Sequence, residues 1–211
     1  MAQDGRDLLR GTVTFVFTDI EGSTRLLHDL GQQRYSQALM SHREALRAAV
    51  ALHDGVEVGT EGDSFFLVFP TTSQALDAVS AGLRALRGSG VEIRVGVHTG
   101  TADLTAEGYV GMDVHRASRI AGAAHGGQVL VSGATAALVD PERFEFRDLG
   151  DHRLKILSIQ ESCRRRGEVV EAPDQQSRNR TRLPAFHGVV TFRYSPDCGR
   201  PLILTDPGRS G

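Results

Sequence analysis

Strand-like and helix-like hydrophobic patterns alternate along most of this chain, and their order limits the folds that it can adopt. A Gly-containing turn, GTEGD, joins the second and third strand-like runs as a hairpin. The expected elements are a strand at 12–18, helices at 23–30 and 34–53, strands at 55–58 and 64–69, a helix at 72–87 and a strand at 91–100. Their order is β-α-β-β-α-β, the split arrangement of a ferredoxin-like α+β core.

The alternation continues beyond this core to about Ser158 and would extend a central antiparallel sheet. The further elements are a turn at GYVG, a helix at about 111–124, a strand at 128–132, a short helix at 133–139 and strands at 144–150 and 152–158. We therefore expect one domain over residues 12–158. Residues 159–211 hold most of the prolines without apolar periodicity, which predicts a disordered tail. Within it, residues 188–195 could form only an isolated strand, which is marginal without a partner.

Composition argues against several classes of function. A formal net charge of −2 gives no basic field for nucleic acid, and no apolar run reaches the roughly 18 residues of a membrane span. The first residues lack the pattern of a secretory signal, so we expect a cytoplasmic protein. Cys163 and Cys198 form no CxxC pair, and any metal would be held by oxygen ligands. His28, His42 and His53 are expected on helix surfaces and not in a zinc site.

Two aspartates occupy corresponding places in the expected sheet. Asp19 ends the first strand, and Asp63 lies in the hairpin between the second and third strands. The first and third strands of a ferredoxin-like sheet are neighbours, so both carboxylates can converge at one edge. Such a pair suits Mg²⁺ or Mn²⁺, which prefers oxygen ligands and is commonly held by one or two carboxylates together with substrate phosphates.

The residues that follow Asp19 offer backbone groups to an anion. Gly22, Ser23 and Thr24 stand at the expected start of a helix, where small side chains leave N–H groups accessible at the positive end of the helix dipole. Ser23 is equally a good N-cap, and each feature alone is more often a turn or a cap than a ligand site. Beside two carboxylates, these residues favour a phosphate-binding role in a nucleotide site.

Five motifs, in this order, resemble the catalytic domain of class III adenylate and guanylate cyclases. They are FTDIEGSTRL at 17–26, TEGDSFFLVF at 60–69, RVGVHTG at 94–100, GYVGMDVHRASRIAGAAHGGQVLVS at 108–132 and DLGDHRLKIL at 148–157. They are most similar to the bacterial branch of the family. The resemblance implies the nucleotide cyclase fold and the conversion of ATP, or less readily GTP, to its 3′,5′-cyclic monophosphate with release of pyrophosphate.

The resemblance also implies roles for individual residues. Asp19 and Asp63 match the aspartates that bind two divalent ions, Mg²⁺ or Mn²⁺, with help from the main-chain carbonyl of Ile20. Arg119 matches the arginine that stabilises the transition state, and Lys155 matches the lysine that reaches the triphosphate from the partner chain. The family's site forms between two subunits, which implies a homodimer. Without the motif match, Arg119 would be interpreted as a solvent-exposed residue of a helix, and Lys155 as an outward-facing residue of a strand.

Three positions depart from the family pattern. Gly59 stands where a lysine reads the purine, and Gly108 stands where an acidic residue pairs with adenine, although Glu107 is adjacent. His115 replaces the asparagine that orients the ribose. Its imidazole could hydrogen-bond the ribose or pack at the dimer interface.

Two hypotheses from different classes therefore stay open. The first is a metal-dependent homodimeric cyclase with low, base-tolerant activity. The second is a catalytically silent cyclase-like module that dimerises or senses nucleotide for a regulatory partner, which the substitutions at Gly59, Gly108 and His115 favour. A different two-metal nucleotidyl enzyme is a weaker third hypothesis, because the motif GYVGMDVHRASR argues against it.

Overall fold

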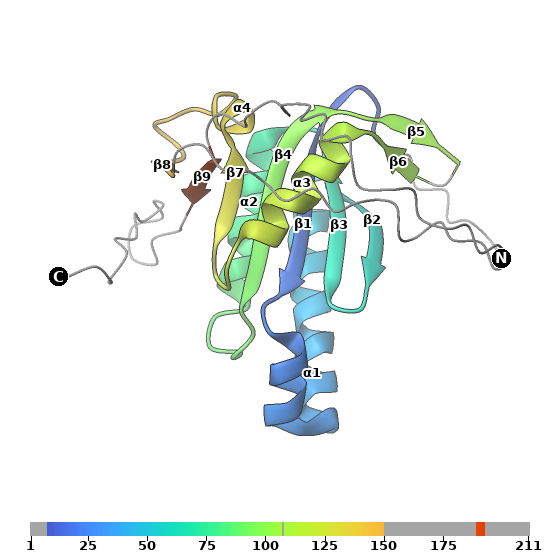
Figure 1. The fold of residues 1–211 in the computed structure, drawn as a ribbon, viewed down its shortest axis with the longest axis vertical. Coiled ribbons are helices and arrows are strands. Elements are labelled where there is room, and N and C mark those ends of the chain that lie inside the picture. Colours follow the sequence, from blue (N-terminus) through green and yellow to red (C-terminus); the bar gives the residue numbers. More distant parts are fainter. Residues whose placement is uncertain (1–7, 107, 150–188, 193–211) are drawn as a thin grey trace, which may run out of the picture.

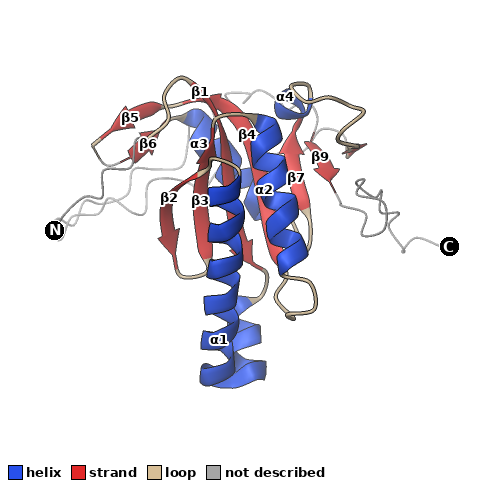
Figure 2. Ribbon diagram, turned by 180° about the vertical axis from the view of Figure 1, so that it is seen from behind, coloured by secondary structure: helices blue, strands red, loops and turns tan. Residues whose placement is uncertain are grey.

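The computed structural model describes residues 8–106, 108–149 and 189–192, which form a central sheet with helices on both faces (Figure 1 and Figure 2). The central strands are β1 (Thr12–Ile20), β2 (Val56–Glu61), β3 (Ser64–Phe69), β4 (Ile93–Thr101), β7 (Val129–Ser132), β8 (Arg147–Asp148) and β9 (Val189–Phe192). A separate hairpin consists of β5 (Asp103–Thr105) and β6 (Gly108–Val110). The helices are α1 (Ser23–Leu52), α2 (Thr72–Ala85), α3 (Met112–Ala123) and α4 (Gly133–Ala136).

The strand order confirms the α+β, ferredoxin-like core that the sequence predicts. The sheet runs β2-β3-β1-β4-β7-β9-β8, and the first four strands are antiparallel neighbours. In the register, Val16 of β1 lies between Leu67 of β3 and Val97 of β4. The parallel pairing of β4 with β7 then extends the sheet. The ends of β1 and β4 and the β2–β3 turn consequently have fixed relative positions.

Alternate residues of β1 contact two different helical layers, as the period of a strand requires. Val16 and Ile20 are buried with residues of α1 and α2. Phe15 faces the other side, where it is buried with Ala117 of α3. The two views agree that α1 and α2 cover one face of the sheet and that α3 covers the other (Figure 1 and Figure 2).

α1 consists of two helical segments that meet at Gly31. Gly31 has φ 74° and ψ 162°, a conformation that glycine adopts at little cost, and it interrupts the helical backbone. The sequence prediction of separate helices at 23–30 and 34–53 is thus confirmed. The second segment packs on the sheet. The first segment lies next to the second one, beyond the end of the sheet (Figure 1). None of the described helices combines the length and the apolar character that crossing a membrane requires.

Two parts of the structure differ from the sequence prediction. The region before α3 was expected to be a turn only, but it contains the β5–β6 hairpin. The prediction that 188–195 could form only an isolated strand is wrong for residues 189–192, which pair with β7 and β8. Strand pairing across more than fifty residues of sequence leaves no local signal. The predicted strand at 152–158 and the rest of the predicted tail lie outside the described residues.

Candidate functional site

Asp19 lies near the C-terminal end of β1, where its carboxylate is held from both neighbouring strands. Ser64 Oγ donates to Asp19 Oδ1 at 2.8 Å. Arg94 Nε donates to Oδ2 at 2.9 Å, and the same guanidinium makes a second, shorter contact to that oxygen. Ser64 is the first residue of β3, and Arg94 is the cross-strand partner of Asp19 on β4. The sheet register therefore fixes the orientation of this carboxylate.

Asp63 lies in the β2–β3 turn, immediately before the serine that contacts Asp19. Its Oδ2 atom is buried and has no hydrogen-bond partner among the described residues. Arg43 of α1 donates to the carbonyl of Gly62 at 2.6 Å and so holds the turn against the helix. The turn itself needs glycine, because Gly62 has φ 59°. The structure thus brings Asp19 and Asp63 to the same end of the sheet.

This pair of carboxylates fits a hard divalent cation. Each carboxylate oxygen has two lone pairs, so Asp19 keeps accepting capacity beside its two donors, and Asp63 Oδ2 is uncommitted. Within the described ranges, no group of three or more His, Cys, Asp or Glu side chains could hold a metal. Further ligands would be oxygens of other kinds, such as the main-chain carbonyl of Ile20, water or substrate phosphate.

The start of α1 lies directly after these acids. The N-cap is Gly22 and not Ser23, since Gly22 has φ 64° and no side chain caps the helix. The first amides of a helix have no intrahelical partner, so the backbone of Ser23 and Thr24 can donate to an anion.

A second set of predicted residues lies on and before α3. His115 and Arg119 are four residues apart and share one helix face, opposite the buried Ala117 and Ile120. Neither the exposed His115 side chain nor the half-buried Arg119 side chain bonds to another residue in the described part of the chain.

Of the two glycines at the base-reading positions, Gly108 lies near the residue that precedes Gly59. Gly108 begins β6 with φ 115°, and a Cβ placed on it would lie 3.9 Å from Val58 Cγ1. Val58 precedes Gly59, which is exposed at a bulge in β2 and has open space where a side chain would be. Neither position can offer a side-chain hydrogen bond to a purine.

The predicted residues therefore form two groups. One holds Asp19, Ile20, Gly22, Ser23, Thr24 and Asp63 at the end of the sheet where α1 begins. The other holds Gly59, Gly108, His115 and Arg119 on β2, β6 and α3. Among the described side chains, no hydrogen bond or ion pair joins the two groups. The predicted phosphate ligand Lys155 lies outside the described residues.

His42 was expected on a helix surface, but it is fully buried in α1. Its ring packs edge-to-face on Phe65 with 5.6 Å between centroids, and neither ring nitrogen has a described partner. Burial lowers the pKa of His42 to about 4, while the Asp63 carboxylate acts in the opposite direction. A sequence signal was present, because His42 precedes the buried Leu46 and Val50 at helical spacing.

The buried imidazole makes stability depend on pH. Between pH 6.5 and about 4 the unfolded chain binds the His42 proton and the folded chain does not, so stability falls as the pH falls, by up to about 1.4 kcal/mol per pH unit. His42→Leu should remove this contribution and leave stability at pH 7 unchanged or raised, because no hydrogen bond is lost. Urea unfolding of both proteins from pH 7.5 to 4.5 measures the two slopes. If the free energy of unfolding changed equally with pH in both proteins, this pH dependence could not be assigned to His42.

Three residues that sequence reasoning did not single out support the acids: Arg43, Ser64 and Arg94. Arg94 and Ser64 fall inside quoted motifs, yet their contact with Asp19 depends on the strand register. The contact of Arg43 with the hairpin depends on how α1 packs. No local pattern carries this information.

Residues 9–168 match the family described as the adenylate and guanylate cyclase catalytic domain. An uncharacterized protein of Mycobacterium tuberculosis is 36% identical over 168 residues, which cover 74% of this chain and 58% of that protein. An adenylate cyclase of Lachancea kluyveri is 32% identical over 153 residues, covering 58% of this chain and 8% of that protein. A structure of an adenylate cyclase from Trypanosoma brucei in a monomeric state shares the fold, with a TM-score of 0.68, 20% identity, and coverage of 89% and 91% of the two chains. This chain thus spans little more than half of the mycobacterial relative.

Proposed function

Because the chain belongs to the adenylate and guanylate cyclase catalytic domain family, we propose that it converts a nucleoside triphosphate to its 3′,5′-cyclic monophosphate and pyrophosphate. The observation that carries the proposal is that Asp19 and Asp63, whose Oδ2 has no hydrogen-bond partner among the described residues, lie at the same end of the sheet, where α1 begins. ATP is the favoured substrate, since the named relative from Lachancea kluyveri is an adenylate cyclase.

The acids would hold two divalent ions, Mg²⁺ or Mn²⁺, together with the carbonyl of Ile20. When bound, such ions supply activation of the ribose 3′-hydroxyl and neutralise charge on the triphosphate. Ser64 and Arg94 fix the orientation of the Asp19 carboxylate, and Arg43 holds the turn that carries Asp63. The amides of Gly22, Ser23 and Thr24 would bind phosphate oxygens.

A second copy of the chain would complete the site. His115 and Arg119 make no hydrogen bond or ion pair with Asp19 or Asp63 of their own chain, and α3 covers the sheet face opposite α1 (Figure 1). In a two-fold symmetric homodimer, α3 of one protomer can face the acids of its partner. Arg119 would then stabilise the charge that develops on the α-phosphate as the 3′-hydroxyl attacks in line. His115 would hydrogen-bond the ribose, and Lys155 would reach the triphosphate.

Weak discrimination between bases follows from Gly59 and Gly108. A hydrogen bond to a buried polar group contributes about 1–3 kcal/mol to selection, and neither glycine can make one through a side chain. We therefore expect the protein to turn over GTP in addition to the favoured substrate, ATP. The retained residues serve the phosphates, while the replaced residues would have served the base.

A catalytically silent nucleotide-binding module is the second candidate, and the same substitutions favour it. Without side chains at Gly59 and Gly108 and with imidazole at His115, nucleotide could bind in a geometry that does not react.

Purified protein incubated with Mn²⁺ and ATP or GTP distinguishes the candidates, with product identified by liquid chromatography and mass spectrometry. Cyclic nucleotide above the background of an Asp63→Ala control would support the cyclase. Nucleotide binding in equilibrium dialysis, with no cyclic product from either substrate, would instead support the silent module.

A further inference from the structure

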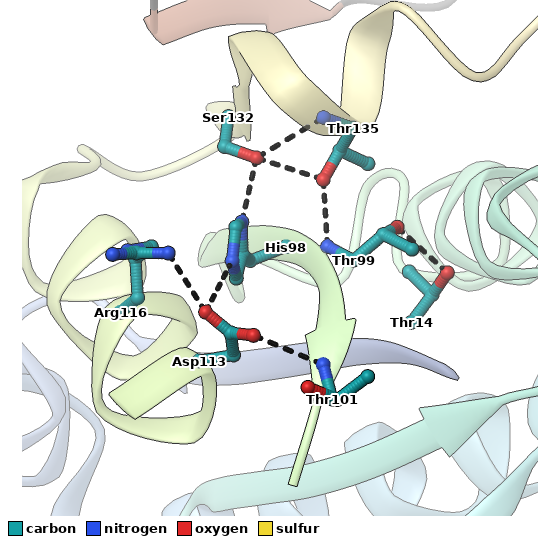
Figure 3. Close-up of polar contacts among 8 residues, drawn as sticks. All are labelled: Thr14, His98, Thr99, Thr101, Asp113, Arg116, Ser132 and Thr135. Atoms are coloured by element: carbon teal, nitrogen blue, oxygen red, sulfur yellow. Dashed lines mark hydrogen bonds and ion pairs between the residues drawn. The ribbon is translucent and has the colours of Figure 1, made fainter. Parts of the chain in front are cut away.

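A buried polar network joins α3 to the central sheet (Figure 3). Its centre is His98 of β4, which is 3% exposed. His98 Nδ1 lies 2.7 Å from Ser132 Oγ, and Nε2 lies 3.2 Å from Asp113 Oδ1. Ser132 ends β7, and Asp113 is in the first turn of α3. One side chain thus links the helix that carries Arg119 to two strands.

The ends of this network are consistent with one direction of its hydrogen bonds. The Thr99 amide can only donate, and it donates to Thr135 Oγ1 at 2.6 Å; that hydroxyl lies 2.7 Å from Ser132 Oγ. At the other end, the Asp113 carboxylate can only accept. All four contacts are satisfied when each hydroxyl donates toward His98 and His98 is neutral with its proton on Nε2. Burial lowers the pKa of His98, in agreement with a neutral ring.

Asp113 also binds the edge of β4 directly. Its Oδ2 accepts from the Thr101 amide at 2.9 Å, and Arg116 donates to Oδ1 at 2.7 Å. A Cβ on Gly100 would lie 2.1 Å from Asp113 Oδ2, so the contact requires glycine there. β4 also approaches the C-terminal part of α3 closely, because a Cβ on Gly96 of β4 would lie 2.1 Å from the Ala121 amide nitrogen. β4 therefore holds both ends of α3.

We propose that Asp113 is a positioning residue that sets the placement of α3, and thereby of Arg119, in the cyclase reaction. Arg119 lies six residues further along the helix, about 9 Å in rise and about 120° around the axis from Asp113. Asp113 therefore does not share the helix face that presents Arg119, and it acts through the helix. The inference rests on the proposed function, because it assigns Asp113 to the reaction only through Arg119.

Asp113→Asn in the full chain tests this role, because the amide keeps the shape but replaces one acceptor oxygen with a donor. The Thr101 amide or His98 then loses its acceptor. We expect kcat to fall about tenfold to a hundredfold, the cost of a misplacement of about 1 Å, with KM for Mn²⁺·ATP little changed. Asp77→Asn is the matched control, since Asp77 pairs with Arg143 away from α3. Its kcat should stay at the parent value.

The double variant Asp113→Asn/Arg119→Ala separates action through Arg119 from an independent effect. If Asp113 acts through Arg119, the double variant is no slower than Arg119→Ala alone. A further loss in the double variant would overturn the inference, as would an unchanged kcat in Asp113→Asn.

Hydrogen exchange provides a readout that needs no turnover. Amides of 112–123 should exchange faster in Asp113→Asn than in Asp77→Asn. Unchanged exchange overturns the placement of α3 by Asp113, whatever the activity. A parent protein that forms no cyclic nucleotide overturns the proposed function, and the assignment of Asp113 to that reaction fails with it.

Discussion

Asp63→Ala should lower the rate of cyclic-nucleotide formation by about a thousandfold or more. The variant removes a carboxylate whose Oδ2 has no hydrogen-bond partner among the described residues, so a ligand for a divalent ion is lost without breaking a hydrogen bond at that atom. Several kcal/mol of charge stabilisation depend on that ion, which corresponds to a loss of this size. Binding of Mn²⁺, followed by electron paramagnetic resonance, should weaken in parallel.

The midpoint temperature of thermal unfolding shows whether the Asp63→Ala variant is folded. It should stay the same or rise, because a buried carboxylate oxygen without a partner costs stability. Asp77→Ala removes an aspartate of α2 and should leave Mn²⁺ binding and turnover unchanged. Parent-level turnover by a folded Asp63→Ala protein would exclude this aspartate as a metal ligand.

Arg119→Ala should lower kcat by about a hundredfold to a thousandfold, the usual cost of removing one group that stabilises transition-state charge. Mn²⁺ binding should be retained, which separates this variant from Asp63→Ala. Stability should also be retained, because the side chain bonds to no other described residue. Steady-state kinetics with Mn²⁺·ATP measure the effect.

Arg143→Ala is the matched control for the arginine variant, as Arg143 pairs with Asp77 on another part of the surface. It should keep the kcat of the parent. If Arg119→Ala and Arg143→Ala had the same kcat, Arg119 would be a solvated helix residue without a part in the reaction.

The core of the fold could be predicted because its elements have strong periodic patterns. The β1 run and the Leu46 and Val50 face of α1 each bury a continuous apolar surface, and their order leaves few sheet topologies. The strands of the β5–β6 hairpin have three residues each, too short for a periodic signal. β9 could not be assigned because its partner β7 is remote in sequence.

The candidate site, like the fold, could be predicted from the sequence only in part. The convergence of Asp19 and Asp63 followed from the pairing of the first and third strands, which the structure contains. The contact of Arg94 with Asp19 required the register, and the approach of Gly108 to Val58 required the hairpin. The His98 and Asp113 network was missed because its four elements meet only in the folded chain.

The most direct test of a site shared between two copies is to mix two inactive variants. In a heterodimer of Asp63→Ala and Arg119→Ala chains, one of the two sites has both the intact acids and the intact arginine. Equal mixing should restore about a quarter of the parent activity, since half of the dimers are heterodimers with one working site each. Native mass spectrometry would verify that heterodimers form. Heterodimers without restored cyclic-nucleotide formation would contradict a site built from two chains.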